Sequence, residues 1–241
     1  MKTIQLILAI SLLSIFSQSC RKGGPWGIKG KGPNVTETKE LEGFDKIHLS
    51  MDADIYYTQD SVYKVEISAQ QNILAVLKTE VKNHALQFDF RRNVWGHSKI
   101  KITVHTPDLN DISISGSGDI TAQNTLNTNA LELSISGSGN INLPSVNAKN
   151  LKVTISGSGD VKISGGSLIS ETFKISGSGD IDAEGIMAEN STITISGSGD
   201  AKVYVTESLD VRISGSGDVH YKGNPSIDSD ISGSGKLTRL D

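Results

Sequence analysis

The sequence predicts an all-β protein whose chain winds into a parallel β-helix, and three observations support this fold. The pentapeptide ISGSG occurs seven times, starting at Ile114, Ile135, Ile155, Ile175, Ile195, Ile213 and Ile231. Successive copies are 21, 20, 20, 20, 18 and 18 residues apart, and a fixed period of about 20 residues is typical of solenoids. Apolar and polar residues alternate on both sides of each copy, which is the periodicity of strands.

One copy shows how a coil of 18–21 residues is expected to be built. Leu151, Val153 and Ile155 share one parity before the motif, and Val161 and Ile163 continue it afterwards. The two glycines of the motif have the same inward parity, which predicts either a close approach of the walls or a bend with unusual backbone angles. A hairpin array is the competing fold, but it needs a regular second turn at half the period, and the second turns here differ between copies.

The first segments along the chain are expected to be targeting segments. Residues 1–19 contain a basic start at Lys2 and an apolar run from Ile4 to Phe16, which predicts a signal peptide. Cys20 follows directly, and this arrangement resembles the signal of a bacterial lipoprotein, in which that cysteine is acylated. A plain signal peptide with an incidental Cys20 is the alternative. Residues 20–39 are rich in Gly, Lys and Pro near their start and are expected to form a flexible tether.

Residues 40–110 are expected to hold about three degenerate coils, followed by roughly seven regular ones in residues 111–241. The segments 49–55, 67–73 and 88–94 match the phase of the ISGSGD motif with weaker sequence identity. The residues around 95–98 are expected to form a loop. A separate small β-domain or cap in residues 40–110 is the alternative.

Most of the chain, from about residue 40 to 240, resembles a family of bacterial envelope proteins known as putative autotransporter adhesins with a head GIN domain. The resemblance rests on the opening FDKI at residues 44–47, on the passage ITVHTPDLNDISISGSGDI at residues 102–120, and on the SGSGD copies. It implies a right-handed β-helix at the cell envelope. The word adhesin is a structural analogy here and specifies no ligand.

Composition narrows the class of partner. Residues 111–241 carry 16 acidic and 9 basic side chains, and residues 20–110 carry 11 acidic and 13 basic ones. A mildly acidic body argues against nucleic acid as the main partner. Cys20 is the single cysteine, so no disulfide can form within the chain.

The candidate site is an outward-facing polar ladder that follows the glycines of each copy. It consists of Asp119, Asn140, Asp160, Asp180, Asp200 and Asp218. Unit charges stacked about 4.8 Å apart repel by roughly 1 kcal/mol per pair in water. Serine hydroxyls and backbone N–H groups at the corner are expected to offset this repulsion. A calcium site along the carboxylates is the alternative, since Ca²⁺ takes six to eight oxygen ligands.

No sequence feature predicts catalysis or a cofactor. The five histidines have no metal-ligand spacing, and no phosphate-binding loop or nucleophile elbow occurs. A β-helical carbohydrate-active enzyme is kept as an alternative, which would need two carboxylates about 5–9 Å apart in a cleft. Trp26, Trp95, Tyr56 and Tyr57 are the aromatic candidates for stacking on a sugar.

The sequence therefore predicts a non-catalytic cell-envelope lipoprotein that presents a repetitive surface for adhesion, scaffolding or glycan binding. A calcium-stabilised structural repeat protein is a further alternative. Expected partners are the membrane, through the lipid on Cys20, and a glycan or an envelope protein. The expected location is the outer membrane, with the facing side and the oligomeric state left open.

Overall fold

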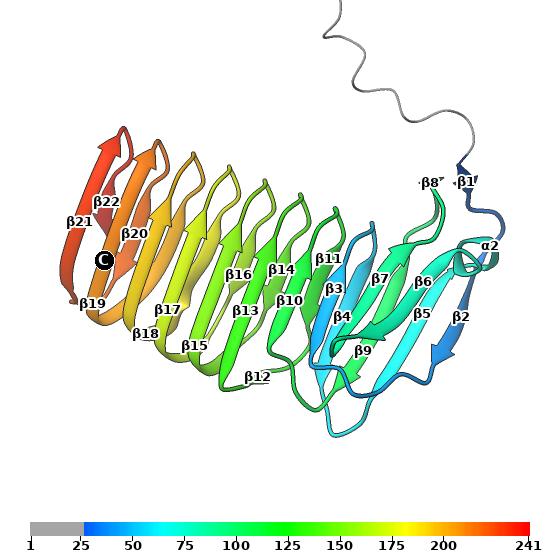
Figure 1. The fold of residues 1–241 in the computed structure, drawn as a ribbon. Coiled ribbons are helices and arrows are strands. Elements are labelled where there is room, and N and C mark those ends of the chain that lie inside the picture. Colours follow the sequence, from blue (N-terminus) through cyan, green and yellow to red (C-terminus); the bar gives the residue numbers. More distant parts are fainter. Residues whose placement is uncertain (1–26) are drawn as a thin grey trace, which may run out of the picture.

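The computed structural model describes residues 27–241 and shows a rod of stacked β-strand coils (Figure 1). In this part of the chain the helical structure is limited to the short α2 (Gln71–Leu74). The predicted all-β parallel β-helix is therefore confirmed. The predicted signal peptide, Cys20 and the first part of the predicted tether lie outside the described residues.

Each regular coil, or rung, has two longer sides joined by the ISGSGD corner. We call the strand before the corner the leading side and the strand after it the trailing side. A short third segment then returns the chain to the next rung. In one rung, β13 (Ala130–Ile135) is the leading side and β14 (Ile141–Leu143) is the trailing side. The start of β15 (Val146–Ile155) is the short segment, and its second half is the leading side of the next rung.

The rungs stack in parallel on both long sides. In order along the rod, the leading sides are β7 (Ala85–Phe90), β3 (Lys46–Leu49), β10 (Asp111–Ile114), β13, β15, β17 (Gly166–Ile175), β18 (Ile181–Ile195), β19 (Ala201–Gly215) and β21 (Ser226–Gly233). The trailing sides are β9 (Lys101–Thr106), β4 (Asp54–Gln59), β11 (Asp119–Ala122), β14, β16 (Val161–Ile163), the first parts of β18 and β19, β20 (Val219–Lys222) and β22 (Leu237–Arg239). On the short side, β12 (Leu126–Asn127) pairs with the start of β15.

The register places equivalent motif residues directly above one another. Ile155 pairs with Ile135 on one side and with Ile175 on the other. This confirms the prediction that identical motifs stack. Where the period shortens from 20 to 18 residues, the pairing of β18 with β19 shifts twice, between Ala183 and Met187 and between Ala188 and Asn190. The short segment therefore absorbs the missing residues, and both long sides keep their register.

The interior is a narrow aliphatic core that runs the length of the rod. The inward isoleucines at 114, 135, 155, 175, 195 and 213 are buried. Along each strand, buried side chains alternate with exposed or half-buried ones. On the last leading side, the equivalent Ile231 is 38% exposed, because no further rung covers it among the described residues. Burial of these columns supplies the main stabilising free energy of the fold.

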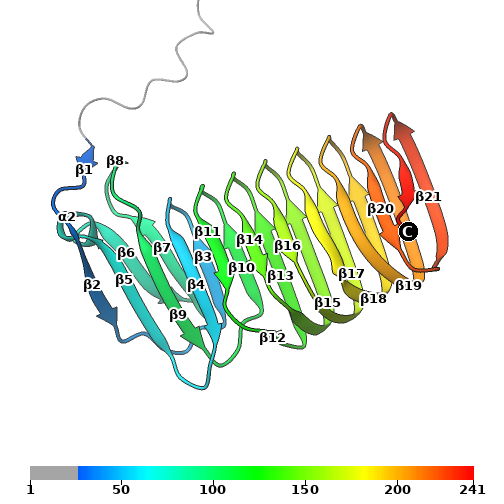
Figure 2. The same cartoon turned by 180° about the vertical axis from the view of Figure 1, so that it is seen from behind.

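The N-terminal rungs are stacked out of sequence order, which the sequence did not predict. The rung made by β3 and β4 lies between the first regular rung, β10 and β11, and the rung made by β7 and β9. In Figures 1 and 2 the blue β3 and β4 therefore stand between strands from later in the chain. Within the predicted segments 49–55 and 88–94, Leu49 pairs with Phe88 on the leading sides, but residues 91–99 leave the stack, and the predicted sequential order is wrong.

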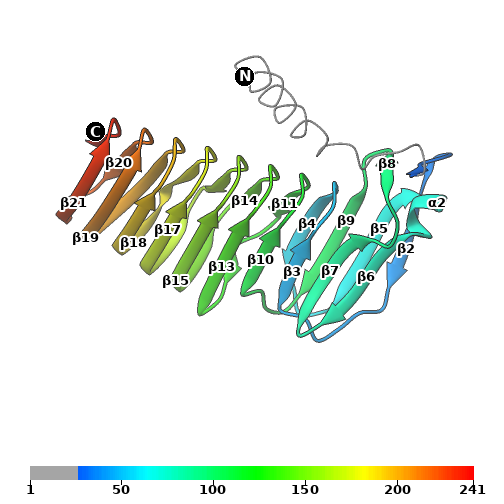
Figure 3. The ribbon, with the colours of Figure 1, turned by 45° about the horizontal axis from the view of Figure 1, so that its top comes forward.

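The predicted coil at residues 67–73 is wrong. Ile67 lies in β5 (Lys64–Gln70), which pairs antiparallel with β9 and with β2 (Asn34–Lys39). A second antiparallel strand, β6 (Leu77–Lys82), pairs with β7. Strands alternate in the same way whether they pair parallel or antiparallel, so alternation alone could not distinguish the two. Residues 40–110 thus contain both rungs and an antiparallel cap, which closes one end of the rod (Figure 3).

The predicted tether over residues 20–39 is wrong for the part that the structure describes. β1 (Ile28–Lys29) pairs with β8 (Val94–Gly96), and β2 completes the cap beside β5. Asn72 holds this segment in place, because its side chain accepts the N–H of Lys31 and donates to the carbonyl of Lys29. Pairing to an open strand edge has outweighed the flexible composition. The predicted loop around residues 95–98 also contains the last residues of β8.

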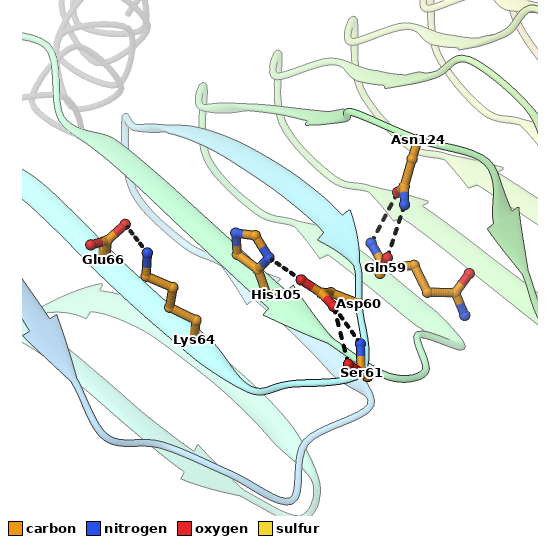
Figure 4. A network of polar contacts seen from close by, with 7 residues as sticks. All are labelled: Gln59, Asp60, Ser61, Lys64, Glu66, His105 and Asn124. Carbon is orange, nitrogen blue, oxygen red and sulfur yellow. Dashed lines mark hydrogen bonds and ion pairs between the residues drawn. The ribbon is translucent and has the colours of Figure 1, made fainter.

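A polar network fixes the junction between the out-of-order rung and the first regular rung (Figure 4). The amide side chain of Asn124 accepts the backbone N–H of Gln59 at 3.0 Å and donates to its carbonyl at 2.8 Å. The Gln59 side chain donates to the carbonyls of Pro107 and Asn127 and accepts the N–H of Asn127. Beside them, His105 lies 3.2 Å from the carboxylate of Asp60.

Candidate functional site

The predicted ladder is a continuous chain of hydrogen bonds from rung to rung. Oδ1 of Asp160 accepts the backbone N–H of Asp180 at 2.9 Å, and Oδ1 of Asp180 accepts the N–H of Asp200 at 2.7 Å. The same bond joins Asp200 to Asp218 at 2.7 Å and Asp218 to Lys236 at 2.8 Å. The structure therefore brings these predicted site residues together in one column along the corner.

The backbone of the corner explains why a side-chain oxygen is needed there. The carbonyl of Gly157 accepts the N–H groups of both Ser178 and Gly179, at 3.0 and 3.2 Å. The next N–H, that of Asp180, donates instead to the side chain of Asp160. Each carboxylate thus receives one backbone N–H from the following rung, and such charge-assisted bonds offset part of the repulsion along the column.

Asn140 shows that an uncharged acceptor oxygen can take the place of a carboxylate in the ladder. Its Oδ1 accepts the N–H of Asp160 at 3.0 Å, as an aspartate does elsewhere in the ladder. Its own N–H and its Nδ2 both donate to Oδ1 of Asp119 at 2.9 Å. At the start of the ladder, the N–H of Asp119 donates to the carbonyl of Ala53. The ladder therefore begins at Asp119, while Asp54 below it pairs with Lys99 at 2.6 Å.

The glycines of the corner are required by close contact between rungs. A Cβ atom on Gly157 would overlap the carbonyl of Gly137, and one on Gly159 would overlap the carbonyl of Gly139 and lie 3.0 Å from Cγ2 of Ile135. The corner is thus a place where a side chain does not fit. Gly215 and Gly233, in the 18-residue rungs, also have positive φ values of 146° and 133°.

The requirement for glycine at the corner ends at the out-of-order rung made by β3 and β4. Met51 and Ala53 occupy the glycine positions of the out-of-order rung and are buried. The rung beneath them leaves the stack over residues 91–99, so no corner lies directly below their side chains. Each glycine is therefore required by the rung that precedes it in the stack.

A shallow polar groove of about 530 Å³ runs beside the ladder on the trailing side. Its lining includes Lys162, Asp182 and Lys202 in addition to the ladder residues. Lys162 pairs with Asp182 across the rungs at 2.6 Å. Burial alone would raise the pKa of Asp182, but its hydrogen bond to Lys162 and the charge of that lysine hold it below its usual value. The same hydrogen bond and the negative charge of Asp182 raise the pKa of Lys162.

A second groove, of about 510 Å³, lies at the other end of the leading sides. It is lined by amide, hydroxyl and charged groups, including Asn110, Asn129 and Asn150. Lys152 and Glu132 form an ion pair of 2.7 Å across adjacent rungs here. Neither groove is lined by an aromatic ring within the described residues. Both surfaces repeat hydrogen-bonding groups along the rod axis.

The aromatic candidates for sugar stacking are separated in the structure. Tyr57 is buried, and burial raises the pKa of its phenol, with a further contribution from the charge of Asp108. Tyr56 is half-buried on β4, and Trp95 is exposed on β8. Trp26 lies outside the described residues. The structure therefore assembles no aromatic platform from Tyr56, Tyr57 and Trp95.

The described residues contain no group of three or more His, Cys, Asp or Glu side chains placed to hold a metal ion. The histidines are dispersed: His48 contacts Asp111, His84 the carbonyl of Gly43, His97 the carbonyl of Ser98, and His105 Asp60, while His220 lies on β20. Within residues 27–241, no helix is both long and apolar enough to cross a membrane.

Sequence reasoning missed one buried carboxyl group. Glu171 on β17 is 2% exposed, and its partners in neighbouring rungs are Leu151 and Ser191. Burial raises the pKa of Glu171 to about 8, and the nearby Ser191 hydroxyl offsets this only in part, since neither carboxylate oxygen makes a hydrogen bond of good geometry. Its inward parity, shared with Phe173 and Ile175, was the signal that could have identified it.

Comparison with known proteins adds a family and several structures. The family model described as "Putative auto-transporter adhesin, head GIN domain" matches residues 43–225. The crystal structure of a putative adhesin from Bacteroides fragilis is 30% identical, and the match covers 89% of this chain and 100% of that chain with a TM-score of 0.83. No curated protein matches the chain significantly.

Two structures from Parabacteroides distasonis are also similar. One is named a putative lipid binding protein and is 27% identical, with coverage of 89% of this chain and 99% of that chain and a TM-score of 0.74. The other is a putative adhesin that is 24% identical, with coverage of 89% and 100% and a TM-score of 0.74. The second similarity shows the fold alone.

Proposed function

The chain belongs to the family of putative auto-transporter adhesins with a head GIN domain, and on that premise we propose that it is a non-catalytic adhesion module of the cell envelope. The carrying observation is the in-register repetition of polar groups on successive regular rungs. The ladder and the two grooves offer carboxylate, amide, hydroxyl and ammonium groups at the spacing of the rungs, about 4.8 Å. Such a surface suits a long polar ligand, and we propose a glycan as that ligand, with an envelope protein as the second candidate.

The repeated surface predicts how affinity depends on ligand length. A glycan that spans several rungs makes the same contacts several times, so its affinity rises steeply with the number of sugar units. A glycan array probed with residues 27–241 tests this, and that segment is a suitable reagent because it contains every strand of the cap and of the rod that the structure describes. Equal binding of short and long oligomers, or no binding to any glycan, contradicts the glycan proposal.

Variants distinguish the two grooves. Lys162→Ala combined with Lys202→Ala removes the cationic groups of the groove beside the ladder. Asn129→Ala combined with Asn150→Ala removes amide groups from the other groove. Binding that falls in one double variant and persists in the other assigns the ligand to one groove. Shortened products after incubation with a bound polysaccharide would instead favour the β-helical carbohydrate-active enzyme.

The calcium-stabilised alternative has a separate test. A chelator that lowers the melting temperature of residues 27–241, with recovery on adding Ca²⁺, would support it. An unchanged melting temperature supports the ladder as a self-contained hydrogen-bonded structure, because each N–H along it already has a side-chain acceptor from Asn140 to Lys236.

We further propose that Cys20 is acylated and anchors the protein to the outer membrane. The name of the 27% identical lipid-binding relative supports contact with lipid. The test is membrane fractionation of cells that express the full chain or its Cys20→Ser variant. The proposal predicts that the full chain sediments with membranes and that the variant is released. Equal distribution of the two proteins contradicts acylation at Cys20.

A further inference from the structure

One end of the rod carries a basic surface that the proposed adhesion function does not use. We define this basic cap surface by Lys29, Lys31, Arg91, Arg92 and Trp95, which lie on or beside β1 and β8. The two segments that carry it, residues 27–36 and 90–101, contain no aspartate or glutamate. All five side chains are exposed. The surface is therefore cationic over two neighbouring stretches of chain.

The pairing of β1 with β8 holds these residues together. The N–H of Ile28 donates to the carbonyl of Asn93 at 2.9 Å, and the N–H of Gly30 donates to that of Gly96 at 2.8 Å. Nε1 of Trp95 donates to the carbonyl of Gly27 at 3.0 Å, which fixes one edge of the indole. The ring nevertheless remains 60% exposed. An exposed indole anchored by its N–H is suited to an interface between water and an apolar phase.

The positive charges of this surface are available to a partner. Lys29 lies over the Trp95 ring at 5.0 Å from its centroid. Among the described residues, none of Lys29, Lys31, Arg91 and Arg92 forms an ion pair with a carboxylate. The acidic groups nearest in sequence to the arginines are Asp89, which accepts the N–H of Phe90, and Glu80, which pairs with Lys78.

The basic cap surface lies close in sequence to Cys20, and this limits its distance from a membrane that holds a lipid on Cys20. Cys20 precedes Gly27 by only seven residues, and seven residues span at most about 25 Å when fully extended. A lipid on Cys20 would therefore keep the basic cap surface within that distance of a bilayer. The regular rungs extend away from this end of the rod toward β21 (Figure 3).

We propose that the basic cap surface docks on the anionic headgroups of a lipid bilayer, with Trp95 at the interface. The basic side chains attract anionic headgroups, and tryptophan favours the headgroup region of membranes. The proposal deepens the envelope function and rests on it for the presence of a nearby membrane. Docking would hold this end of the rod at the bilayer, while the regular rungs extend from it toward β21 (Figure 3).

The test uses the chain from residue 20 onward with Cys20→Ser, so that no lipid contributes, and with Trp26→Phe, so that Trp95 is the single tryptophan. The probe is a phosphatidylcholine vesicle with or without phosphatidylglycerol, at about 0.1 M salt. The proposal predicts sedimentation and a blue shift of Trp95 emission with the anionic vesicles only. Arg91→Ala combined with Arg92→Ala should lower the partition coefficient about thirty-fold, and raised salt should lower it further.

The matched control is Lys222→Ala combined with Arg239→Ala, which removes the same charge from the opposite end of the rod. It should change the partition coefficient by no more than about two-fold. Equal losses in both double variants, or no binding to anionic vesicles, overturn the docking proposal. Circular dichroism melting curves of all variants identify any loss that comes from misfolding.

The acylation proposal and the docking proposal can be refuted independently of each other. If the full chain is anchored in cells but the Cys20→Ser protein does not bind anionic vesicles, docking is wrong and the anchor stands. If the Cys20→Ser protein binds anionic vesicles but fractionation shows no effect of Cys20, acylation is wrong and docking stands.

Discussion

Replacing Glu171 tests whether a carboxylic acid is kept neutral inside the rod. In the unfolded chain this group has an ordinary pKa near 4.5, and burial raises the pKa in the folded state to about 8. Below pH 4.5 the carboxyl group is protonated in both states, so its titration does not affect the free energy of unfolding. As the pH rises from 4.5 to 8, the unfolded chain releases the proton while the folded chain keeps it, so the stability of the fold decreases. Above pH 8 both states are ionised and the loss is complete.

The size of the effect follows from the shift. One pKa unit corresponds to about 1.4 kcal/mol, so the stability lost across the whole window is about 5 kcal/mol, of which about 3 kcal/mol is lost by pH 7. Glu171→Gln keeps the shape and removes the titration. The free energy of unfolding of this variant should therefore exceed that of the wild type by an amount that grows with pH.

The assay is urea unfolding of both proteins at several pH values between 5 and 8.5. Other titrating groups are the same in both proteins, so the difference between the two curves isolates Glu171. A difference that rises by several kcal/mol between pH 5 and 8 supports a neutral buried carboxyl group. A constant difference would refute the reasoning, since it would mean that the Glu171 carboxylate reaches water in the folded protein.

Three further changes test the corner and the junction. Gly159→Ala should destabilise the fold by about 3 kcal/mol or more, because the new methyl group overlaps the backbone of the preceding rung. The control Gly165→Ala, where the nearest atom to the new Cβ is 3.6 Å away, should change stability by less than about 0.5 kcal/mol. Similar melting temperatures of the two variants would contradict the close packing of the corner. Asp180→Ala should cost about 1–2 kcal/mol in urea unfolding and Asp180→Asn much less, since an amide oxygen replaces the acceptor; equal losses would mean that the charge itself is required. Gln59→Ala should lower the free energy of unfolding by about 1–2 kcal/mol, because it removes the side-chain hydrogen bonds at the junction. The control Gln123→Ala should be neutral in the same measurement, since the Gln123 side chain makes no hydrogen bond in the described structure. A neutral Gln59→Ala would show that backbone pairing alone holds the out-of-order rung.

The regular part of the rod could be predicted because local pattern and long-range pairing coincide there. Each copy of the motif pairs with the copy before it, so the parity of Ile155 and Ile175 also determined their register. The ladder followed from the same register. The sequence predicts that backbone N–H groups at the corner bond to polar side chains. It does not predict that each Oδ1 accepts the N–H of the next rung and not one of its own rung.

The N-terminal part could not be predicted in the same way, because its order in space differs from its order in the chain. Leu49 pairs with Ile114, which lies 65 residues later in the sequence. Nothing in the alternation around Ile67 indicates an antiparallel partner, since its neighbours on β2 and β9 are distant in sequence. Glu171 was missed for the opposite reason: its position was predictable, but a single polar residue in an apolar column carries little periodic signal.

The reciprocal contacts at the corner have a consequence for how the length of this protein can change. Each regular rung presents the same carbonyl and the same side-chain oxygen to the rung after it and uses the same two groups of the rung before it. A tandem duplication of residues 156–175 would thus insert an additional module of about 4.8 Å while leaving the cap and the final strands with their original neighbours. Genetic gain or loss of whole units can adjust the reach of the molecule, and the terminal segments need no compensating mutation.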